Sequence, residues 1–219
     1  MILCIESATK NCSVSLFSDA GSYHREQSAE KYIHAETLHR FIDEVLKEAG
    51  CKPQAVAVSM GPGSYTGLRI GVAAAKGLSF SWDVPLIGIP TLDHMAKHMS
   101  EVRPGFDYYI PMIDARRMEV FTCVYNSNGE PLTEVEAHIL DESSFKDFKG
   151  SACVFGDGAE KSKEVLQGSF EFEVDYLPTA KGMKSIATQK FAEKAFEDVA
   201  YFEPFYLKEF IAGKPRPLL

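Results

Sequence analysis

The stretch "SMGPGSYTGLRIGVAAAKGLSF", Ser59–Phe80, joins the end of an apolar strand to a helix through a turn rich in glycine and proline. Unpaired N–H groups at the N-terminus of such a helix attract anions, and the helix dipole adds to that attraction. No Gly-Lys-Ser/Thr follows the turn, so it is not a Walker A loop. Two interpretations stay open: a phosphate-binding loop, or a tight turn whose glycines only supply positive φ.

The helix in this stretch carries a large share of glycine and alanine. A glycine inside a helix costs about 1 kcal/mol relative to alanine, so its presence indicates that another surface approaches closely. That surface is either the helix's own sheet or a partner helix, and the second interpretation favours an interaction protein over a free-standing enzyme. The predicted partner-contact residues are Gly67, Arg69, Ile70, Gly71, Ala74, Ala75 and Leu78.

A strand–acid–turn–strand pattern occurs once in each half of the chain. In the first half "ILCIE" ends on Glu6 and an alternating strand follows; in the second half "YIPMID" ends on Asp114 and "MEVFTCVY" follows. Hairpins need antiparallel neighbours, so a duplicated α/β lobe explains the pattern better than one doubly wound sheet. We expect lobes over residues 1–103 and 104–219, each a mixed sheet with helices, with the last segment able to pack back on the first lobe.

The composition excludes some classes of function. The formal net charge is −8, from 31 acidic and 23 basic side chains, whereas a protein that binds nucleic acid by itself needs a basic surface. The five cysteines are scattered and form no CxxC pair, which is typical of reduced thiols and not of a disulfide framework or a zinc site. The N-terminus does not resemble a signal peptide, and no apolar run reaches the ~20 residues of a membrane span. We therefore expect a cytoplasmic protein without a membrane partner.

Three turns carry candidate phosphate contacts. The first is the hairpin turn after Glu6, for which an ordinary solvated turn is the alternative interpretation. The second is the glycine-rich turn, and the third is a strand-to-helix junction in "FGDGAE", where the aspartate is equally suited to an N-cap. The candidates are Ser7, Thr9, Gly61, Gly63, Ser64, Gly156, Asp157 and Gly158.

Other polar groups are weaker candidates for chemistry. His94 and His98 lie four residues apart on a predicted helix and so share a face, but a metal needs a third ligand and Asp93 points elsewhere. We interpret both as surface histidines and predict no metal site. Arg116 and the neighbouring Asp114 and Arg117 lie at a strand end, where we favour a salt-bridged turn. No nucleophile motif is found, so no catalytic residue is assigned.

With "ILCIESATKNCSVSLF", "GPGSYTGLRIG", "GIPTLDHMA", "IDARRMEVFTCVY" and the trailing "PFYLKE", the chain resembles the TsaB (YeaZ) family over nearly its whole length. The resemblance implies a two-lobed α/β fold of the actin-like ATPase superfamily (ASKHA, ribonuclease H-like). It also implies a role in forming threonylcarbamoyladenosine next to the anticodon of tRNAs that read codons beginning with A.

The same resemblance implies a division of labour. A longer relative, TsaD, performs the transfer and carries a metal-binding His-x-x-x-His; the TsaB-like chain is its non-catalytic dimerization partner, and an ATPase, TsaE, joins them. Contact with tRNA is then expected only through the complex, and a second copy of the chain is the alternative partner for the same helix surface, which would give a homodimer. No cofactor is required, although ATP or ADP contact is expected at the partner interface. Two alternatives stay open: a metal-dependent, glycoprotease-like hydrolase using His94 and His98, and a small-molecule kinase using Asp114 as base.

Overall fold

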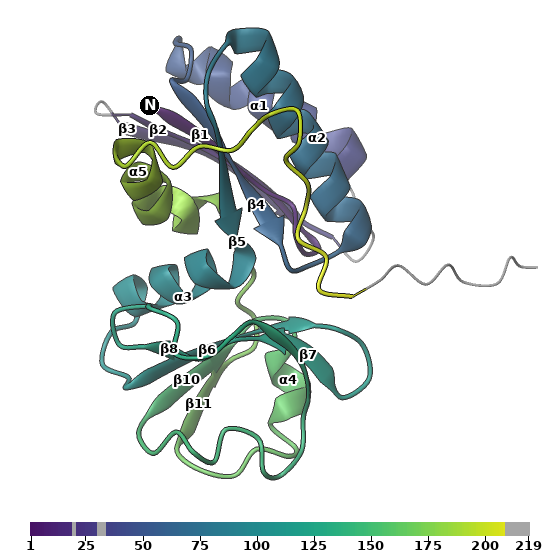
Figure 1. Cartoon of the computed structure of the whole chain (residues 1–219), viewed down its shortest axis with the longest axis vertical. Helices are drawn as coiled ribbons and strands as arrows, with labels where there is room; N and C mark the ends of the chain where they lie inside the picture. Colours follow the sequence, from purple (N-terminus) through teal and green to yellow (C-terminus); the bar gives the residue numbers. More distant parts are fainter. Residues whose placement is uncertain (19–20, 30–33, 209–219) are drawn as a thin grey trace, which may run out of the picture.

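The computed structural model describes residues 1–18, 21–29 and 34–208, which form two lobes stacked along the long axis of the molecule (Figure 1). The N-terminal lobe is built on a five-stranded sheet in the order β3-β2-β1-β4-β5. β1 lies antiparallel to β2 and parallel to β4, so the sheet is mixed, as predicted. Its strands are β1 Ile2–Glu6, β2 Asn11–Ser18, β3 Gly21–Ser28, β4 Ala55–Gly61 and β5 Leu86–Pro90.

Helices cover both faces of this sheet, because alternate residues of a strand point to opposite sides. Leu3 and Ile5 of β1 belong to the core on one face. Ile2 and Cys4 belong to the core on the other face. The helices are α1 His34–Ala49 and α2 Tyr65–Trp82 on the first face, and the 3-10 helix η1 Ala180–Met183 and α5 Lys184–Ala192 on the second.

The C-terminal lobe repeats this arrangement with a second mixed sheet in the order β11-β10-β6-β7-β9, with β8 paired to β6. β6 is antiparallel to β7 and parallel to β10. The strands are β6 Tyr108–Asp114, β7 Glu119–Thr122, β8 Tyr125–Asn126, β9 Glu136–Ile139, β10 Ala152–Phe155 and β11 Phe170–Glu173. The helices are α3 Thr91–Val102 between the lobes and the short α4 Ala159–Ser162.

Helix α3, which lies just before the predicted boundary at residues 103 and 104, contacts both lobes. Leu92, Met95 and Met99 of α3 share a core with Tyr109 of β6, so α3 belongs to the second sheet as much as to the first. After residue 177 the chain returns to the N-terminal lobe, where Met183 packs on the first sheet. Helix α3 thus buries one face against each lobe, and the last segment packs back on the first lobe as predicted.

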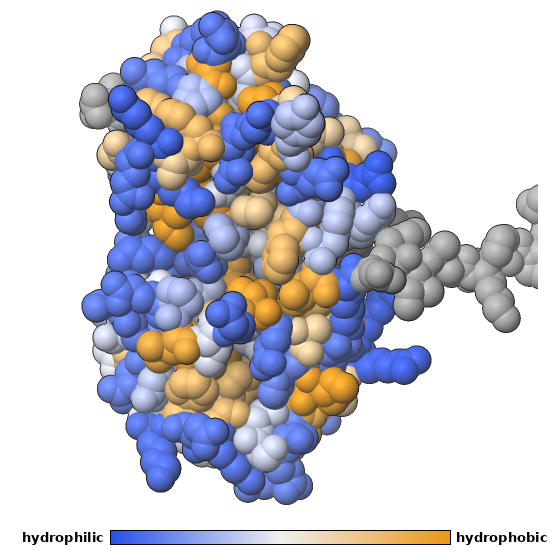
Figure 2. Space-filling model, viewed as in Figure 1, coloured by the Kyte–Doolittle hydropathy of each residue, from blue (hydrophilic) through white to orange (hydrophobic). Residues whose placement is uncertain are grey.

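The end of the described chain crosses from one lobe to the other, and we call residues 203–208 the C-terminal strap. The Phe205 amide donates to the Met60 carbonyl at 2.7 Å, and Lys208 pairs with Glu119 of β7. Figure 1 shows the strap running beside α2 toward the junction of the lobes. At that level hydrophobic side chains gather on the surface (Figure 2). The strap therefore links the lobes a third time, after α3 and the segment that returns near residue 177.

The predicted repeat of two hairpins is confirmed. In β1 the last residue, Glu6, pairs with Ser13 of β2, and in β6 the last residue, Asp114, pairs with Val120 of β7. Both acids thus stand where a central strand enters a turn. Among the helices of the described residues, none is long and apolar enough to cross a bilayer.

Candidate functional site

The two hairpin turns face a common cleft between the lobes, with a volume of about 690 Å3. Thr9 comes from the first turn, Arg116 and Arg117 come from the second, and Asp157 comes from the strand-to-helix junction. Ser64, from the glycine-rich turn, lines the same cleft. The three turns that were predicted from the sequence as separate candidate phosphate contacts therefore line one cleft.

The glycine-rich turn is shaped by its contacts with the first hairpin turn. The Ser64 amide donates to the Ala8 carbonyl at 2.7 Å, and the Ser64 hydroxyl accepts from the Gly67 amide at 3.3 Å, which caps α2. A Cβ atom on Gly63 would lie 2.4 Å from the Ala8 carbonyl oxygen. Gly61 has a φ of 116°, which favours glycine. Close packing accounts for these glycines, and their phosphate contacts stay a prediction.

The second hairpin turn holds two consecutive arginines in left-handed backbone. φ is 74° at Arg116 and 53° at Arg117, a strained conformation that the surroundings must hold in place. Lys161 holds it: its Nζ donates to the Arg117 carbonyl at 2.8 Å and pairs with the Asp114 carboxylate. The turn is salt-bridged as predicted, but the ion pair joins Asp114 to Lys161 and not to Arg116 or Arg117, which are both exposed beside the cleft.

Asp157 anchors the end of β6 to the strand-to-helix junction. Its Oδ1 accepts from the Asp114 amide at 2.9 Å, and burial raises the pKa of the Asp157 carboxyl. A Cβ atom on Gly156 would lie 2.2 Å from the Met112 carbonyl oxygen, so this glycine lets the two strands' ends meet. Gly158 occupies the N-cap position of α4, so the N-cap interpretation of Asp157 is wrong.

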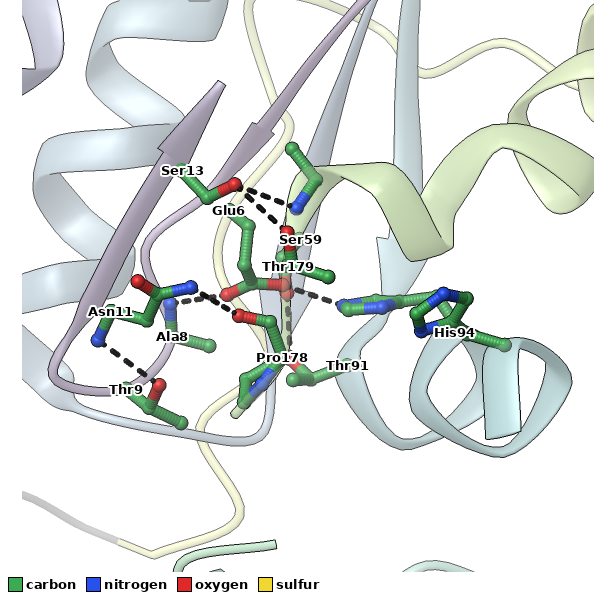
Figure 3. A network of polar contacts seen from close by, with 12 residues as sticks. Glu6, Ala8, Thr9, Asn11, Ser13, Ser59, Thr91, His94, Pro178 and Thr179 are labelled. Atoms are coloured by element: carbon green, nitrogen blue, oxygen red, sulfur yellow. Dashed lines mark hydrogen bonds and ion pairs between the residues drawn. The ribbon is translucent and has the colours of Figure 1, made fainter. Parts of the chain in front are cut away.

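The interpretation of His94 as a surface histidine is also wrong. His94 and Glu6 are both fully buried, and His94 Nε2 lies 2.6 Å from Glu6 Oε2 (Figure 3). The other carboxylate oxygen of Glu6 accepts from the Ala8 amide at 2.6 Å. His98 is half-buried, and its Nδ1 lies 3.2 Å from the Tyr176 hydroxyl. The i, i+4 spacing places both histidines on one side of α3, and that side faces the protein interior at His94.

The first hairpin is also tied to the returning C-terminal segment (Figure 3). Asn11 Nδ2 donates to the Pro178 carbonyl at 2.9 Å, and the Ser13 hydroxyl lies 3.1 Å from that of Thr179. The Ala180 amide donates to the Ser13 hydroxyl at 3.0 Å. Nothing local in the sequence marks these pairs, because their members lie more than 160 residues apart.

Four of the predicted partner contacts on α2 face the protein's own sheet. A Cβ atom on Gly67 would lie 2.1 Å from the Ser7 carbonyl oxygen, and one on Gly71 would lie 2.1 Å from Ser7 Oγ. Ala74 and Ala75 are buried in the core of the N-terminal lobe. The prediction is therefore wrong for these four residues, since the helix's own sheet is the surface that approaches closely.

The opposite side of α2 faces outward, and we call it the outer face of α2. Arg69 is exposed, and its Nη1 donates to the Tyr65 hydroxyl at 2.7 Å. Ile70 and Leu78, the other predicted contacts, are half-buried at its edges. Phe80 is 83% exposed and adds a large apolar side chain to the small residues of this face. The exposed residues of this face are Thr66, Arg69, Ala73, Gly77 and Phe80.

The fold and the cleft define a class of protein. Each lobe begins with an antiparallel hairpin and continues into parallel strands, and the two hairpin turns face one another across the cleft. This is the two-lobed α/β architecture of the actin-like ATPase (ASKHA) superfamily, as predicted.

Comparisons with known proteins narrow the class. The family model described as "TsaD: tRNA N6-adenosine threonylcarbamoyltransferase" matches residues 27–212. The tRNA threonylcarbamoyladenosine biosynthesis protein TsaB of Escherichia coli is 31% identical over 228 residues, covering 99% of this chain and 98% of its own length. The TsaB of Haemophilus influenzae is 27% identical over 230 residues, covering 99% and 97%.

A solved structure shares the fold over nearly the same extent. It is described as an uncharacterized protein with similarity to peptidase YEAZ from Pseudomonas aeruginosa; it superposes with a TM-score of 0.84 at 23% identity and covers 94% of this chain and 99% of its own. Because the likeness to the Escherichia coli protein spans almost both chains, this chain belongs to the TsaB (YeaZ) family.

Proposed function

We propose that this chain is a non-catalytic cytoplasmic subunit that pairs with a TsaD-type transferase in forming threonylcarbamoyladenosine next to the tRNA anticodon. The names of the full-length relatives support the pathway. The observation that carries the pairing is the outer face of α2, where small residues and an exposed phenylalanine lie on the surface with no covering segment among the described residues.

The outer face of α2 suits a helix of a partner. Thr66, Ala73 and Gly77 lie at positions i, i+7 and i+11, which fall on one side of a helix, and their small side chains let another backbone approach. Phe80 supplies an apolar anchor at one end, and Arg69 supplies a cation near the other. A TsaD-type subunit is the partner we favour, because its family model matches most of this chain and thus implies a related lobe with a related helix.

Two buried or paired acids support the non-catalytic role. Glu6 contacts His94 Nε2 with one carboxylate oxygen and accepts from the Ala8 amide with the other, so both of its oxygens already have protein partners. Asp114, the candidate base of the kinase alternative, is paired with Lys161. Both groups maintain turns, which argues against the hydrolase and kinase alternatives.

The nucleotide and the third component follow from the same proposal. We propose that ATP or ADP contacts this chain beside Arg116 and Arg117, because exposed arginines bind phosphate groups in forked geometry. A TsaE-type ATPase is the component expected to bring that nucleotide, and tRNA is expected to contact the assembled complex. When the transferase is absent, a second copy of this chain is expected to bind the outer face of α2 and form a homodimer.

Size-exclusion chromatography with light scattering tests the pairing, using this chain with and without the TsaD-type protein of the same organism. We expect a heterodimer that replaces any homodimer. Gly77→Arg should weaken it at least about tenfold, because an arginine in a packed helix interface displaces the partner. The new side chain fits the free chain, since a Cβ atom at Gly77 meets nothing within 4 Å.

Thr188→Arg is the matched control, since it places the same side chain at an exposed position of α5, on the other face of the sheet. Equal loss with both variants, or a monomer that ignores the transferase, overturns the proposal.

A further inference from the structure

A second cavity lies between the lobes, apart from the cleft of the two hairpin turns. Its volume is about 660 Å3, within the range of small-molecule sites. Pro62 of the glycine-rich turn lines it from the N-terminal lobe, Leu132 lines it from the loop after β8, and Phe205 lines it from the strap. A molecule held there would therefore touch both lobes and the strap at once. We call it the proline cavity.

The walls of the proline cavity are mainly apolar. Prolines and large apolar side chains supply them, and Phe205 and Leu132 are 41% and 49% exposed, so the rim is open to a ligand. Such walls take up an aliphatic or flat apolar group by removing it from water. The apolar lining residues are Met60, Pro62, Pro90, Cys123, Pro131, Leu132, Val135 and Phe205, so prolines from both lobes take part.

The charged groups of the proline cavity all have one sign. Asp93 of α3 and Glu134 of the loop before β9 line it, whereas none of its described lining residues is a lysine, arginine or histidine. Asp93 is half-buried, and its Oδ1 accepts from the Tyr125 hydroxyl at 2.7 Å. That neutral partner fixes the orientation of the carboxylate without neutralising it.

We propose that the proline cavity binds an organic cation, a guanidinium or ammonium group on an apolar stem, with the cationic head at Asp93 and Glu134 and the stem between the prolines and Phe205. Asp93 makes no direct ion pair among the described residues and feels Lys190 only through space, so a cationic head in this position supplies a charge in direct contact with the half-buried carboxylate. Burial also raises the pKa of the Asp93 carboxyl, which a bound cation would lower again. The proposal does not depend on the pairing with a transferase.

The probe is agmatine, titrated into the full-length chain labelled with 13C in its methionine methyl groups. Met60 lines the cavity and Met118 does not, so the Met60 signal, assigned with Met60→Leu, should shift saturably while that of Met118 stays. Agmatine carries a second cation at the end of its stem, so pentylguanidine, with one cationic head on an apolar stem, should shift the same signal. Pentylurea, its uncharged analogue with the same stem, should bind at least about tenfold more weakly than pentylguanidine, because it lacks the charge-assisted hydrogen bond.

Asp93→Asn tests the site directly, since the amide oxygen can still accept from Tyr125. We expect the Kd for agmatine to rise at least about tenfold in this variant, and less in Glu134→Gln, because Glu134 is exposed at the rim. Glu136→Gln, an exposed acid two residues along that does not line the cavity, should leave the Kd unchanged. Unchanged methyl signals of Met95 and Met99 on α3 verify that Asp93→Asn keeps the fold.

Two results would overturn the proposal: no shift of Met60 at millimolar agmatine, or equal weakening by Asp93→Asn and Glu136→Gln, which would indicate general attraction to an acidic surface. The source of the cation is found by repeating the titration on the complex with the transferase. Loss of agmatine binding there indicates a lysine or arginine side chain supplied by the partner. Retained binding indicates a free small molecule.

Discussion

The two hairpin turns of this protein occupy equivalent places in the two lobes, but the acid that ends the central strand has a different fate in each. Glu6 is fully buried and held by His94 and the Ala8 amide. Asp114 is 48% exposed and held by Lys161. The first acid thus lies in the protein interior, and the second lies at the surface beside the cleft. Topology thus places an acid, and the packing around it decides whether it supports the structure or faces a ligand.

Removing the buried acid should have the largest effect. Glu6→Ala leaves His94 and the Ala8 amide without their partner, and breaking a buried pair costs about 3–5 kcal/mol, or roughly 6–20 °C in Tm for a chain of this size. Asp114→Ala should cost only about 0–1 kcal/mol, because the pair it breaks is half-exposed. Urea unfolding of the two variants measures the difference directly. Similar losses would contradict the contrast between the turns.

The inner glycines of α2 test how tightly the first turn is held. Gly71→Ala should destabilise by about 1–3 kcal/mol, because its Cβ would lie 2.1 Å from Ser7 Oγ, so either Ser7 rotates and loses its hydrogen bond to the Gly67 carbonyl or the helix moves away. Gly77→Ala, in open space on the outer face of the same helix, should instead stabilise by about 1 kcal/mol. Thermal unfolding of the two variants measures the expected fall in Tm for Gly71→Ala and the expected rise for Gly77→Ala. A neutral Gly71→Ala would show that α2 is not locked on the turn.

The second turn should loosen locally when its lysine is removed. Lys161→Met breaks the contacts with Asp114 and with the carbonyls of Arg117 and Glu119, yet it should lower global stability by only about 1 kcal/mol or less, since surface pairs contribute little. Hydrogen exchange should accelerate at the Glu119 amide, which donates to the Arg116 carbonyl at 3.2 Å inside this turn. The Ser64 amide of the first turn serves as control and should keep its protection. Faster exchange at both would mean that the turns are coupled.

The free energy of unfolding should depend slightly on pH through Asp157, which lies beside the second hairpin turn. Burial raises the pKa of Asp157 in the folded chain, so folding favours its protonated form. Its contribution to stability is therefore complete below the unfolded pKa of ~3.9 and is lost as pH rises through the higher folded value. Asp157→Asn should remove this loss. The free energy of unfolding of the variant, relative to that of the native chain, should therefore rise between the unfolded and the folded pKa of Asp157 and stay constant above the folded pKa. Urea unfolding at a series of pH values measures it; a constant difference would contradict the assignment.

Local sequence patterns predicted the strands and helices but not which residues pack against them in the folded protein. The alternation in "NCSVSLFS" and the acid at the end of "ILCIE" predicted the first hairpin, because strand periodicity is a property of adjacent residues. The same reasoning failed for His94, whose partner Glu6 lies 88 residues away. It failed also for Gly67 and Gly71, because small residues on a helix indicate close approach without identifying what approaches.

The sequence by itself determined the repeated hairpins, the mixed sheets, the acids at the strand ends and the family, since each depends on short-range pattern or on long matching segments. The tertiary structure alone decided which side of α2 is free, that His94 is a core residue, that α3 belongs to both lobes, and that Asp93 and Glu134 share a cavity with prolines from both lobes. The physical reason is that burial and charge pairing depend on residues far apart in the chain, which only the folded packing brings into contact.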